Sequence, residues 1–228
     1  MEMMMKNIVL ITIIVLINTN AFGQNKSQSV DSVSQDSVSQ DSVYIIPNSN
    51  PPTERFKIPE GNCGEACLST VFRMQGKTTP QKKINASGTI YNRGLHGFEI
   101  KKVVQKKNIL HKDISIVTPK YSEYIREIII PIILSGNPIL LGVKIYPDTH
   151  PEWTADHFIL LVGYDANTDK IFYNTGHLRR SISVNKLLNK KDGYSLLNKR
   201  NKIYAIQFAG TSNGKLYVPA KFDKYYKP

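Results

Sequence analysis

The chain has 228 residues, of which 41% are hydrophobic and 21% charged, and its formal net charge is +12. This length fits one globular domain with additional segments, and the apolar share is large enough to build a core. The positive charge favours anionic partners such as lipid headgroups, acidic envelope polymers or acidic peptides, although an ordinary lysine-rich surface is the simpler explanation. No basic helix with interleaved aromatic residues is present, so nucleic-acid binding is not expected.

The N-terminus, residues 1–23, has the pattern of a secretory signal peptide. Lys6 precedes an apolar run from Ile8 to Ile17, and small and polar residues follow up to Gln24. The run is about ten residues long, whereas a membrane-spanning helix needs about 20. We therefore expect an exported protein, periplasmic or extracellular, with no transmembrane segment after signal cleavage. An uncleaved anchor helix is the alternative.

Residues 24–52 are predicted to form a low-complexity, flexible linker. The pentapeptide Asp-Ser-Val-Ser-Gln begins at Asp31 and again at Asp36, and the segment from Pro47 to Pro52 then resists regular structure. Such a Ser-, Gln- and Asp-rich stretch buries too little apolar surface to offset its ordering entropy. The folded domain is expected over residues 53–210, and residues 211–228 are expected to form a basic and aromatic C-terminal tail.

Helices come first in the expected domain, and strands follow. Apolar spacing predicts helices over residues 63–75, 98–107 and 121–135, the last bent or interrupted at Pro131. Strands are expected over residues 110–117, 139–146, 158–164, 170–173, 181–184 and 203–208, with a turn at residues 165–169. Helices followed by an antiparallel sheet make an α+β fold.

Cys63 and Cys67 are the chain's two cysteines. A bridge between them would close only a short loop, so stability must come from the core, and one thiol becomes a candidate for chemistry. Cys63 follows turn residues at a predicted helix start, where free N–H groups favour a thiolate and can hold an oxyanion. Gly64 would let a substrate backbone approach closely. Cys67 is expected in the core; a structural thiol or a Cys63–Cys67 bridge is the alternative for Cys63.

A cysteine nucleophile needs an imidazole to take its proton. His157 opens the buried strand, so it can face a cleft while the strand holds it in place. The remaining histidines sit in turns, loops or less favourable positions, and no pair has metal-ligand spacing with carboxylates nearby. We therefore predict no metal and no cofactor. The five histidines are His96, His111, His150, His157 and His177.

The hairpin after His157 supplies a third polar side chain. Pairing Tyr164 with Lys170 brings Asn174 to the same end of the ladder as His157. An Asn there can accept from the imidazole N–H and fix its tautomer, the third role of a catalytic triad. The register leaves Asp156 and Thr175 as alternatives for this role.

Four motifs, in this order, resemble those of the papain-like cysteine peptidases that remove double-glycine leaders from bacteriocins, and of their free-standing relatives. The resemblance covers about residues 58–208. Its motifs are Asn-Cys-Gly-Glu-Ala-Cys-Leu at residues 62–68, Gly-Leu-His-Gly-Phe at 94–98, Ser-Gly-Asn-Pro-Ile-Leu-Leu at 135–141 and Asp-His-Phe-Ile-Leu-Leu-Val-Gly-Tyr-Asp at 156–165.

The resemblance implies a papain-like fold and a thiol peptidase that acts on peptide or protein substrates. Cys63 would be the nucleophile, His157 the base and acid, and Asn174 the third member. The chain has Asn174-Thr175 where the family has Asp-Pro, and residues 56–60 lack the family's Gln. The backbone N–H of Cys63 would then complete the oxyanion hole with another donor, such as Asn62.

Two other functions use the same residues. A cell-wall peptide amidase or acyl transferase would need the same Cys–His–Asx order, and a basic surface would suit anionic wall polymers. A degenerate domain would bind a peptide in the cleft without turnover, which the missing Gln favours. The family's bacteriocin processors are fused to a transporter that this chain lacks, so its substrate need not be a double-glycine leader.

Overall fold

The computed structural model of the chain describes residues 42–145, 150–189 and 193–225. The predicted signal peptide and most of the predicted linker lie outside these residues. Within them, no helix is both long and apolar enough to cross a membrane.

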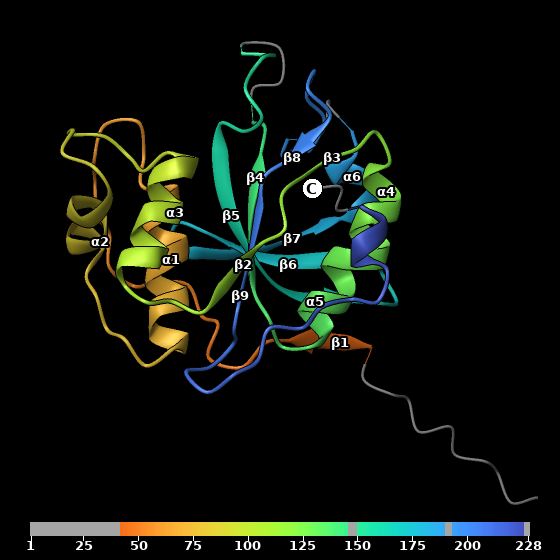
Figure 1. The fold of residues 1–228 in the computed structure, drawn as a ribbon, viewed down its shortest axis with the longest axis horizontal. Coiled ribbons are helices and arrows are strands. Elements are labelled where there is room, and N and C mark those ends of the chain that lie inside the picture. The colour runs from red at the N-terminus through yellow and green to blue at the C-terminus, as the bar shows by residue number, and fades with distance from the viewer. Residues whose placement is uncertain (1–41, 146–149, 190–192, 226–228) are drawn as a thin grey trace, which may run out of the picture. The chain divides into compact units, whose positions relative to one another are not determined.

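An antiparallel sheet of seven strands forms the centre of the molecule (Figure 1). Its strand order is β2-β9-β4-β5-β6-β7, and β1 pairs with the far end of β5. A two-stranded ribbon, β3–β8, lies beside it. The strands are β1 (Val43–Ile45), β2 (His111–Asp113), β3 (Ile116–Val117), β4 (Ile139–Val143), β5 (His157–Asp165), β6 (Lys170–Thr175), β7 (Leu178–Ser183), β8 (Lys202–Ile203) and β9 (Ala205–Phe208).

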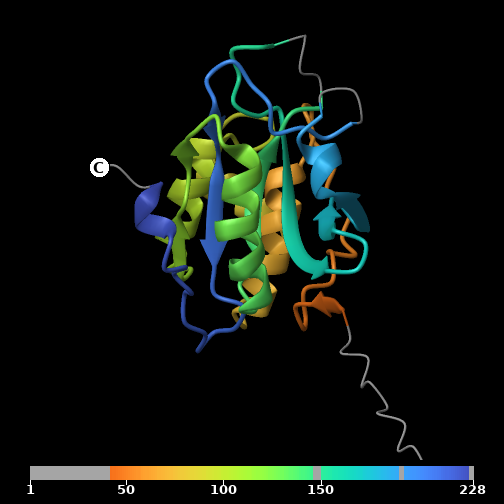
Figure 2. The ribbon, with the colours of Figure 1, turned by 90° about the vertical axis from the view of Figure 1, so that its right-hand side faces the viewer.

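Helices cover both faces of the sheet. In Figure 2, the continuous helix that contains α4 and α5 lies in front of the strands, and α1 lies behind them. One layer holds α1 (Cys63–Met74), α2 (Gln81–Gly88) and α3 (Gly97–Lys106); the other holds α4 (Tyr121–Tyr124), the π-helix η1 (Ile125–Ile129) and α5 (Ile130–Leu134). A short α6 (Val184–Leu187) follows β7, and a 3-10 helix, η2 (Phe222–Lys224), ends the described chain. The predicted α+β class is confirmed.

The central strand β5 is buried on both sides, which explains its continuous apolar sequence. Because successive strand residues point to opposite faces, Leu160 and Val162 pack in the core beneath α1, while Ile159 and Leu161 pack in the core beneath α4 and α5. All four side chains are fully buried. By this alternation Phe158 packs on the α1 side of the sheet, and His157, the first residue of β5, falls on the other side with Ile159 and Leu161.

Pro131 has the effect on its helix that the sequence predicts. The helix runs from Tyr121 to Leu134, but the five residues before α5 form a π-helix. Proline has no N–H to donate and its ring crowds the preceding turn, and a π-turn accommodates the resulting irregularity. The chain then leaves the helix at Gly136, whose φ of +85° suits glycine.

The folded unit is larger than predicted at both ends. β1 lies inside the range assigned to the linker, and Ile46 and Ser49 are buried beyond it. In the predicted tail, Phe222 is 3% exposed and joins the core. Composition identifies the Ser/Asp repeats, but it does not show that the short apolar segment after them pairs with the free end of β5. Residues 42–52 and 211–225 therefore belong to the domain.

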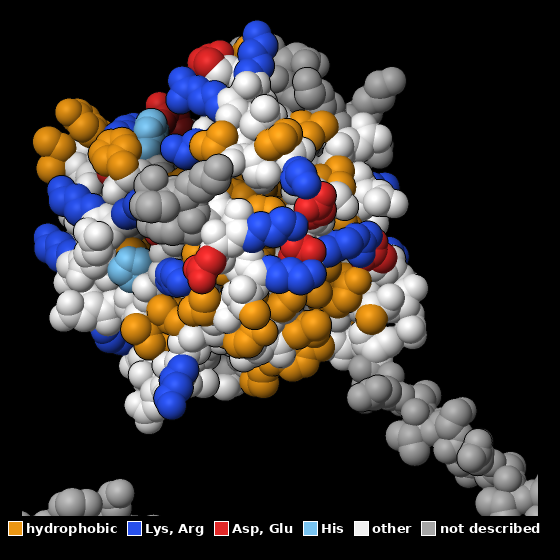
Figure 3. Space-filling model, turned by 45° about the vertical axis from the view of Figure 1, so that its right-hand side comes forward, with side chains coloured by type: hydrophobic (Ala, Val, Ile, Leu, Met, Phe, Trp, Pro, Cys, Tyr) orange, Lys and Arg blue, Asp and Glu red, His pale blue; other side chains and the backbone are white. Residues whose placement is uncertain are grey.

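Other differences concern short elements. The sequence did not predict α2 or α6, which have eight and four residues. The strand expected over residues 110–117 is divided into β2 and β3, and that over 203–208 into β8 and β9, because the chain passes from the large sheet to the ribbon between them. On the face drawn in Figure 3, lysine and arginine side chains lie beside carboxylates in the middle of the surface.

Candidate active site

Cys63 begins α1 after a tight turn. Glu60 and Gly61 have φ values of +65° and +82°, and the second of these suits glycine. Gly94 lies against this turn, since a Cβ on it would come within 2.1 Å of the Gly61 carbonyl oxygen. Only a glycine permits this approach. Gly94, the first residue of the Gly-Leu-His-Gly-Phe motif, therefore has a packing role next to the turn that leads to Cys63.

The Cys63 sulfur lies against the first residues of β5. The Phe158 backbone forms a hydrogen bond to it, and the N–H groups of Cys63 and Gly64 do the same. One turn along α1, the Cys67 thiol is 3.8 Å from the Phe158 carbonyl oxygen. Cys67 is 2% exposed among the apolar residues under α1, and both thiols are free. Cys63 is half-buried.

Burial decides the charge of the Cys63 thiol. It raises the pKa of Cys63 to about 11, and the nearby Glu65 carboxyl acts in the same direction. The backbone hydrogen bonds at the helix start oppose this rise but do not cancel it. The sequence argument that the helix N-terminus favours the thiolate is therefore outweighed, and the group rests as a neutral thiol at pH 7.

His157 has a defined set of partners at the first position of β5. Its Nε2 lies 2.9 Å from Thr175 Oγ1 and 3.3 Å from the Tyr194 hydroxyl, and these two oxygens are 3.2 Å apart. The Tyr194 ring stacks on the imidazole at 5.1 Å between centroids and 22° between planes. Burial lowers the pKa of His157 to about 4, against the opposing effect of Asp156. The resting imidazole is neutral.

Asn174 has side-chain partners other than the predicted His157. It pairs with Leu160, on the α1 side of the sheet, and its side-chain amide donates to the Ser49 carbonyl at 2.6 Å. Its amide oxygen accepts from Arg179 Nε at 3.2 Å. Thr175, which follows Asn174, points to the opposite face and contacts the imidazole. These contacts place Thr175, and not Asn174, beside His157.

Strand alternation explains why Asn174 does not reach the histidine. The hairpin pairs Asp165 with Lys170, one residue away from the pairing assumed from the sequence, but the bulge between Leu161 and Gly163 shifts the register back, so Leu160 lies opposite Asn174 as the assumed pairing also required. Asn174 therefore shares the face of Leu160, whereas Thr175 shares the face of His157 and contacts its ring. Thr175 was one of the alternatives; Tyr194 was not considered, because it arrives from a loop far along the chain.

Asp156, the other alternative, is tied to a buried lysine. Its carboxylate lies 3.1 Å from Lys144 Nζ and accepts the Ile145 N–H at 2.6 Å. The Lys144 and Asp156 side chains are 1% and 8% exposed. Lys144 also donates to the His150 carbonyl at 2.8 Å. This ion pair joins the ends of the loop before β5 and so holds the chain that leads to His157.

Asn62 and Gly64, the predicted oxyanion and substrate residues, both have structural partners. The Asn62 side-chain amide donates to Gln81 Oε1 at 2.7 Å, and the Gln81 amide donates to the Glu54 carbonyl at 2.9 Å. A Cβ on Gly64 would lie 3.0 Å from Ile100, so this glycine allows α1 to pack against α3. The backbone N–H groups of Cys63 and Gly64 remain as the donors that face the sulfur.

Glu65 is a further residue that the sequence did not single out. It is fully buried, and its Oε1 accepts from Asn85 Nδ2 at 2.6 Å and from the Leu95 N–H at 3.1 Å. These bonds tie the start of α1 to α2 and to the loop before α3. Burial raises the pKa of Glu65 above its ordinary value.

The other histidines lie apart from this arrangement. His96 caps α3 in a box with Glu99, His111 Nδ1 lies 2.6 Å from the Ile109 carbonyl, and His150 stacks on Trp153 at 4.0 Å. His177 is exposed in the turn between β6 and β7. In the described parts of the chain, no group of three or more His, Cys, Asp or Glu side chains could hold a metal ion.

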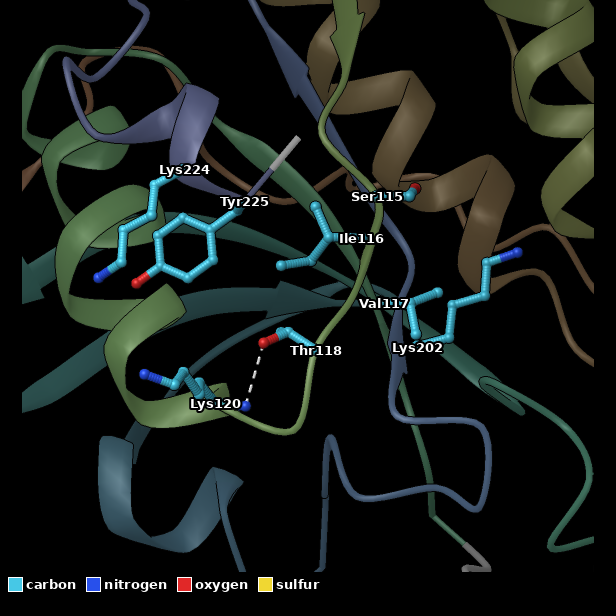
Figure 4. Close-up of a pocket in the computed structure, with 8 residues that line it drawn as sticks. All are labelled: Ser115, Ile116, Val117, Thr118, Lys120, Lys202, Lys224 and Tyr225. Atoms are coloured by element: carbon cyan, nitrogen blue, oxygen red, sulfur yellow. Dashed lines mark hydrogen bonds between the residues drawn. The ribbon is translucent and has the colours of Figure 1, made fainter. Parts of the chain in front are cut away.

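A cavity of about 610 Å³ lies between the β3–β8 ribbon and η2 (Figure 4). Its described lining includes Lys120, Lys202 and Lys224 around the apolar side chains of Ile116 and Val117, and it contains neither cysteine nor histidine. Lys120 and Lys224 are paired with Glu123. This cavity shares no described lining residue with the surroundings of Cys63 or of His157. No described contact joins the Cys63 and His157 side chains themselves; the Phe158 backbone, which bonds to the Cys63 sulfur and follows His157 in β5, relates the two, and we take these groups as the candidate active site.

No protein-family model and no curated protein matches this chain. It is similar to a putative C39-like peptidase from Bacillus anthracis, with a TM-score of 0.49 and 12% identity over 72% of this chain and 96% of that one. A second similar structure is the N-terminal peptidase C39 like domain of a toxin secretion ATP-binding protein from Vibrio parahaemolyticus. Its TM-score is 0.40 and its sequence identity 13%, over 68% of this chain and 99% of that one.

UfSP from C. elegans is similar at a TM-score of 0.45 and 13% identity, over 73% of this chain and 34% of that one. All three TM-scores are below 0.5, so these similarities assign no site residues. The candidate site is defined by the contacts described above.

Proposed function

We propose that this chain is an exported cysteine peptidase of papain-like fold that hydrolyses peptide or amide bonds outside the cytoplasm. The observation that carries the proposal is the position of Cys63. Its sulfur lies at the start of α1 and accepts a backbone hydrogen bond from Phe158, the residue that follows His157. The signal-peptide pattern of residues 1–23 supports export.

The chemistry begins from a neutral pair. His157 Nε2 faces Thr175 and Tyr194, which leaves Nδ1 to take the proton of the Cys63 thiol as the sulfur attacks the substrate carbonyl. The imidazolium then gives that proton to the leaving amine, and a thioester forms on Cys63. Water, deprotonated by His157, hydrolyses the thioester and regenerates the thiol.

Thr175 and Tyr194 orient the histidine in this proposal. A hydroxyl that accepts from Nε2–H fixes the tautomer in which Nδ1 has its lone pair free. Thr175 thus takes the third position that sequence analysis gave to Asn174. A neutral hydroxyl stabilises an imidazolium less than a carboxylate does, so we expect modest turnover.

Backbone N–H groups serve as the oxyanion donors. The N–H groups of Cys63 and Gly64 already face the sulfur, where the attacked carbonyl oxygen would develop its charge. The Asn62 amide donates to Gln81, so its second N–H is the one that could turn toward a substrate.

A peptide or protein is the proposed substrate. The excess of lysine and arginine over acidic residues supports an acidic peptide or an acidic envelope component as the partner.

A non-catalytic peptide-binding domain is the second candidate. The observation that favours it is the protonation state of the pair: burial keeps the thiol protonated and the imidazole neutral, and no described carboxylate contacts His157 Nε2. Such a domain would bind peptides in the same place without forming an acyl intermediate.

The two candidates are separated by a thiol-reactive peptide probe that traps the nucleophile, with the labelled residue found by mass spectrometry. The peptidase proposal predicts label on Cys63, its loss in Cys63→Ala and its retention in Cys67→Ala. The Cys67→Ala variant is the matched control, because it removes the other thiol one turn along the same helix. Equal labelling of Cys63→Ala excludes Cys63 as the nucleophile, and peptide binding without any label on Cys63 favours the second candidate.

A further inference from the structure

A second cavity lies next to the histidine. It is an open depression of about 480 Å³, which is within the volume range of small-ligand sites, and the side chains of Lys170, Arg180 and Lys186 are exposed. It is bounded by β6, β7, α6 and the loop that carries Tyr194. Its described lining residues are Ile145, Lys170, Tyr173, Arg180, Ser181, Ile182, Ser183, Lys186, Gly193 and Tyr194.

The charge of this cavity is of one sign. Lys170, Arg180 and Lys186 line it, and none of its described lining residues is acidic. No ion pair joins any of the three to a carboxylate of the described chain. In the cavity of Figure 4, by contrast, Lys120 and Lys224 are each paired with a glutamate. The three cations of this cavity therefore remain available to an anionic ligand.

Tyr194 connects this cavity to the candidate active site. The residue lines the cavity, and its hydroxyl lies 3.3 Å from His157 Nε2 while its ring stacks on the imidazole. Tyr173, which also lines the cavity, meets the Tyr194 ring edge-on at 5.6 Å between centroids. A group bound among the cations would thus touch the side chain that orients the histidine.

We propose that this cavity is a subsite for the carboxylate of an acidic residue in the peptide substrate. The inference rests on the proposed function, because the subsite is useful only if a peptide lies across Cys63 and His157. Arginine and lysine are the usual donors to a carboxylate, and Arg180 offers a planar pair of N–H groups for a two-point contact. Asp and Glu are the residues that supply such a group in an unmodified peptide.

The test uses binding without turnover. The full chain carrying Cys63→Ala is titrated with a peptide that contains one Glu, and separately with the same peptide in which Gln replaces that Glu. Calorimetry or fluorescence anisotropy measures the dissociation constant of each peptide. We expect tighter binding of the Glu peptide. In the Arg180→Gln/Lys186→Gln variant its binding should weaken by about tenfold, while binding of the Gln peptide stays unchanged. Lys186→Gln alone, at an exposed position, should give a smaller loss and serves if the double variant does not fold.

Lys202→Gln/Lys224→Gln is the matched control, since it removes the same charge from the cavity of Figure 4. Equal weakening in the control would mean that net charge alone attracts the peptide, and no weakening in either variant would mean that the cavity is not used. Both outcomes overturn the proposal, as does inorganic phosphate that displaces the Glu peptide at equal concentration. Because binding is measured without Cys63, failure here leaves the labelling test of the peptidase separate.

Discussion

The two halves of the candidate site are built in different ways. On the cysteine side, the backbone does most of the positioning: a tight turn at Gly61, the first turn of α1 and a main-chain hydrogen bond from Phe158. On the histidine side, side chains from distant segments do it, namely Thr175 at the end of β6 and Tyr194 from a later loop. The comparison teaches that local turn chemistry can be read from sequence, whereas a set of converging side chains cannot.

The largest expected effect concerns the ion pair that holds the histidine side. In Lys144→Ala, the buried Asp156 carboxylate would lose the ammonium group that faces it, and breaking such a buried ion pair costs about 3–5 kcal/mol. Urea unfolding of this variant measures the loss. The matched control is Lys221→Ala, which breaks a more exposed pair with Glu127 and should cost much less, because solvent screens that pair. Equal losses would contradict the importance of burial here.

The next effect is the pH dependence of stability from His157. Its pKa is lowered to about 4 in the folded chain, from an ordinary value of 6.5, so the unfolded chain binds the proton more readily. This contribution to stability is complete above pH 6.5 and is lost as the pH falls to about 4, by about 1–3 kcal/mol. His157→Gln should flatten this part of the curve of unfolding free energy against pH. If His157→Gln leaves this curve unchanged, the pKa of His157 is not lowered in the folded chain.

Asn174 and Thr175 give the most discriminating pair of variants. Asn174→Ala removes a buried amide from Ser49 and Arg179 and should cost about 1–3 kcal/mol of stability, with little change in the pH profile of turnover. Thr175→Val keeps the shape but removes the hydroxyl from His157, so turnover should fall by about tenfold with a smaller change in stability. The reverse result would restore Asn174 to the catalytic role.

Tyr194→Phe should have the smallest effect. The variant keeps the ring that stacks on the imidazole and removes only the longer of the two hydroxyl contacts with Nε2. We expect turnover to fall by less than about tenfold, since Thr175 still holds the tautomer. Tyr194→Ala, which also removes the ring, should be slower; a larger loss in Tyr194→Phe than in Thr175→Val would make the tyrosine the main positioning residue.

The sequence carried the parts of this account that depend on local pattern. The helix at Cys63, the buried strand after His157 and the hairpin turn were all visible in residue spacing. The helix break before Pro131 followed from the missing N–H of proline. Even the identity of Cys67 as a core thiol could be argued, because it falls on the apolar side of the helix.

The choice of Asn174 failed for a local reason, because strand alternation places it on the face of Leu160 and places Thr175 on the face of His157. The other failures depend on long-range packing. The segment around Ser49 was assigned to the linker, yet the Ser49 carbonyl accepts a hydrogen bond from the Asn174 side-chain amide. The helix-dipole argument for a thiolate gave the right sign for one contribution, but the desolvation that outweighs it depends on what the fold places around the sulfur.

The most direct test of the central claim is the rate of Cys63 alkylation against pH, in a chain with Cys67→Ser so that one thiol reports. A neutral thiol and a neutral imidazole predict a rate that keeps rising with pH toward the raised pKa of about 11, with no plateau in the acid range. A plateau between about pH 4 and pH 8 that disappears in His157→Ala would instead reveal a thiolate–imidazolium pair, and would contradict the neutral resting site.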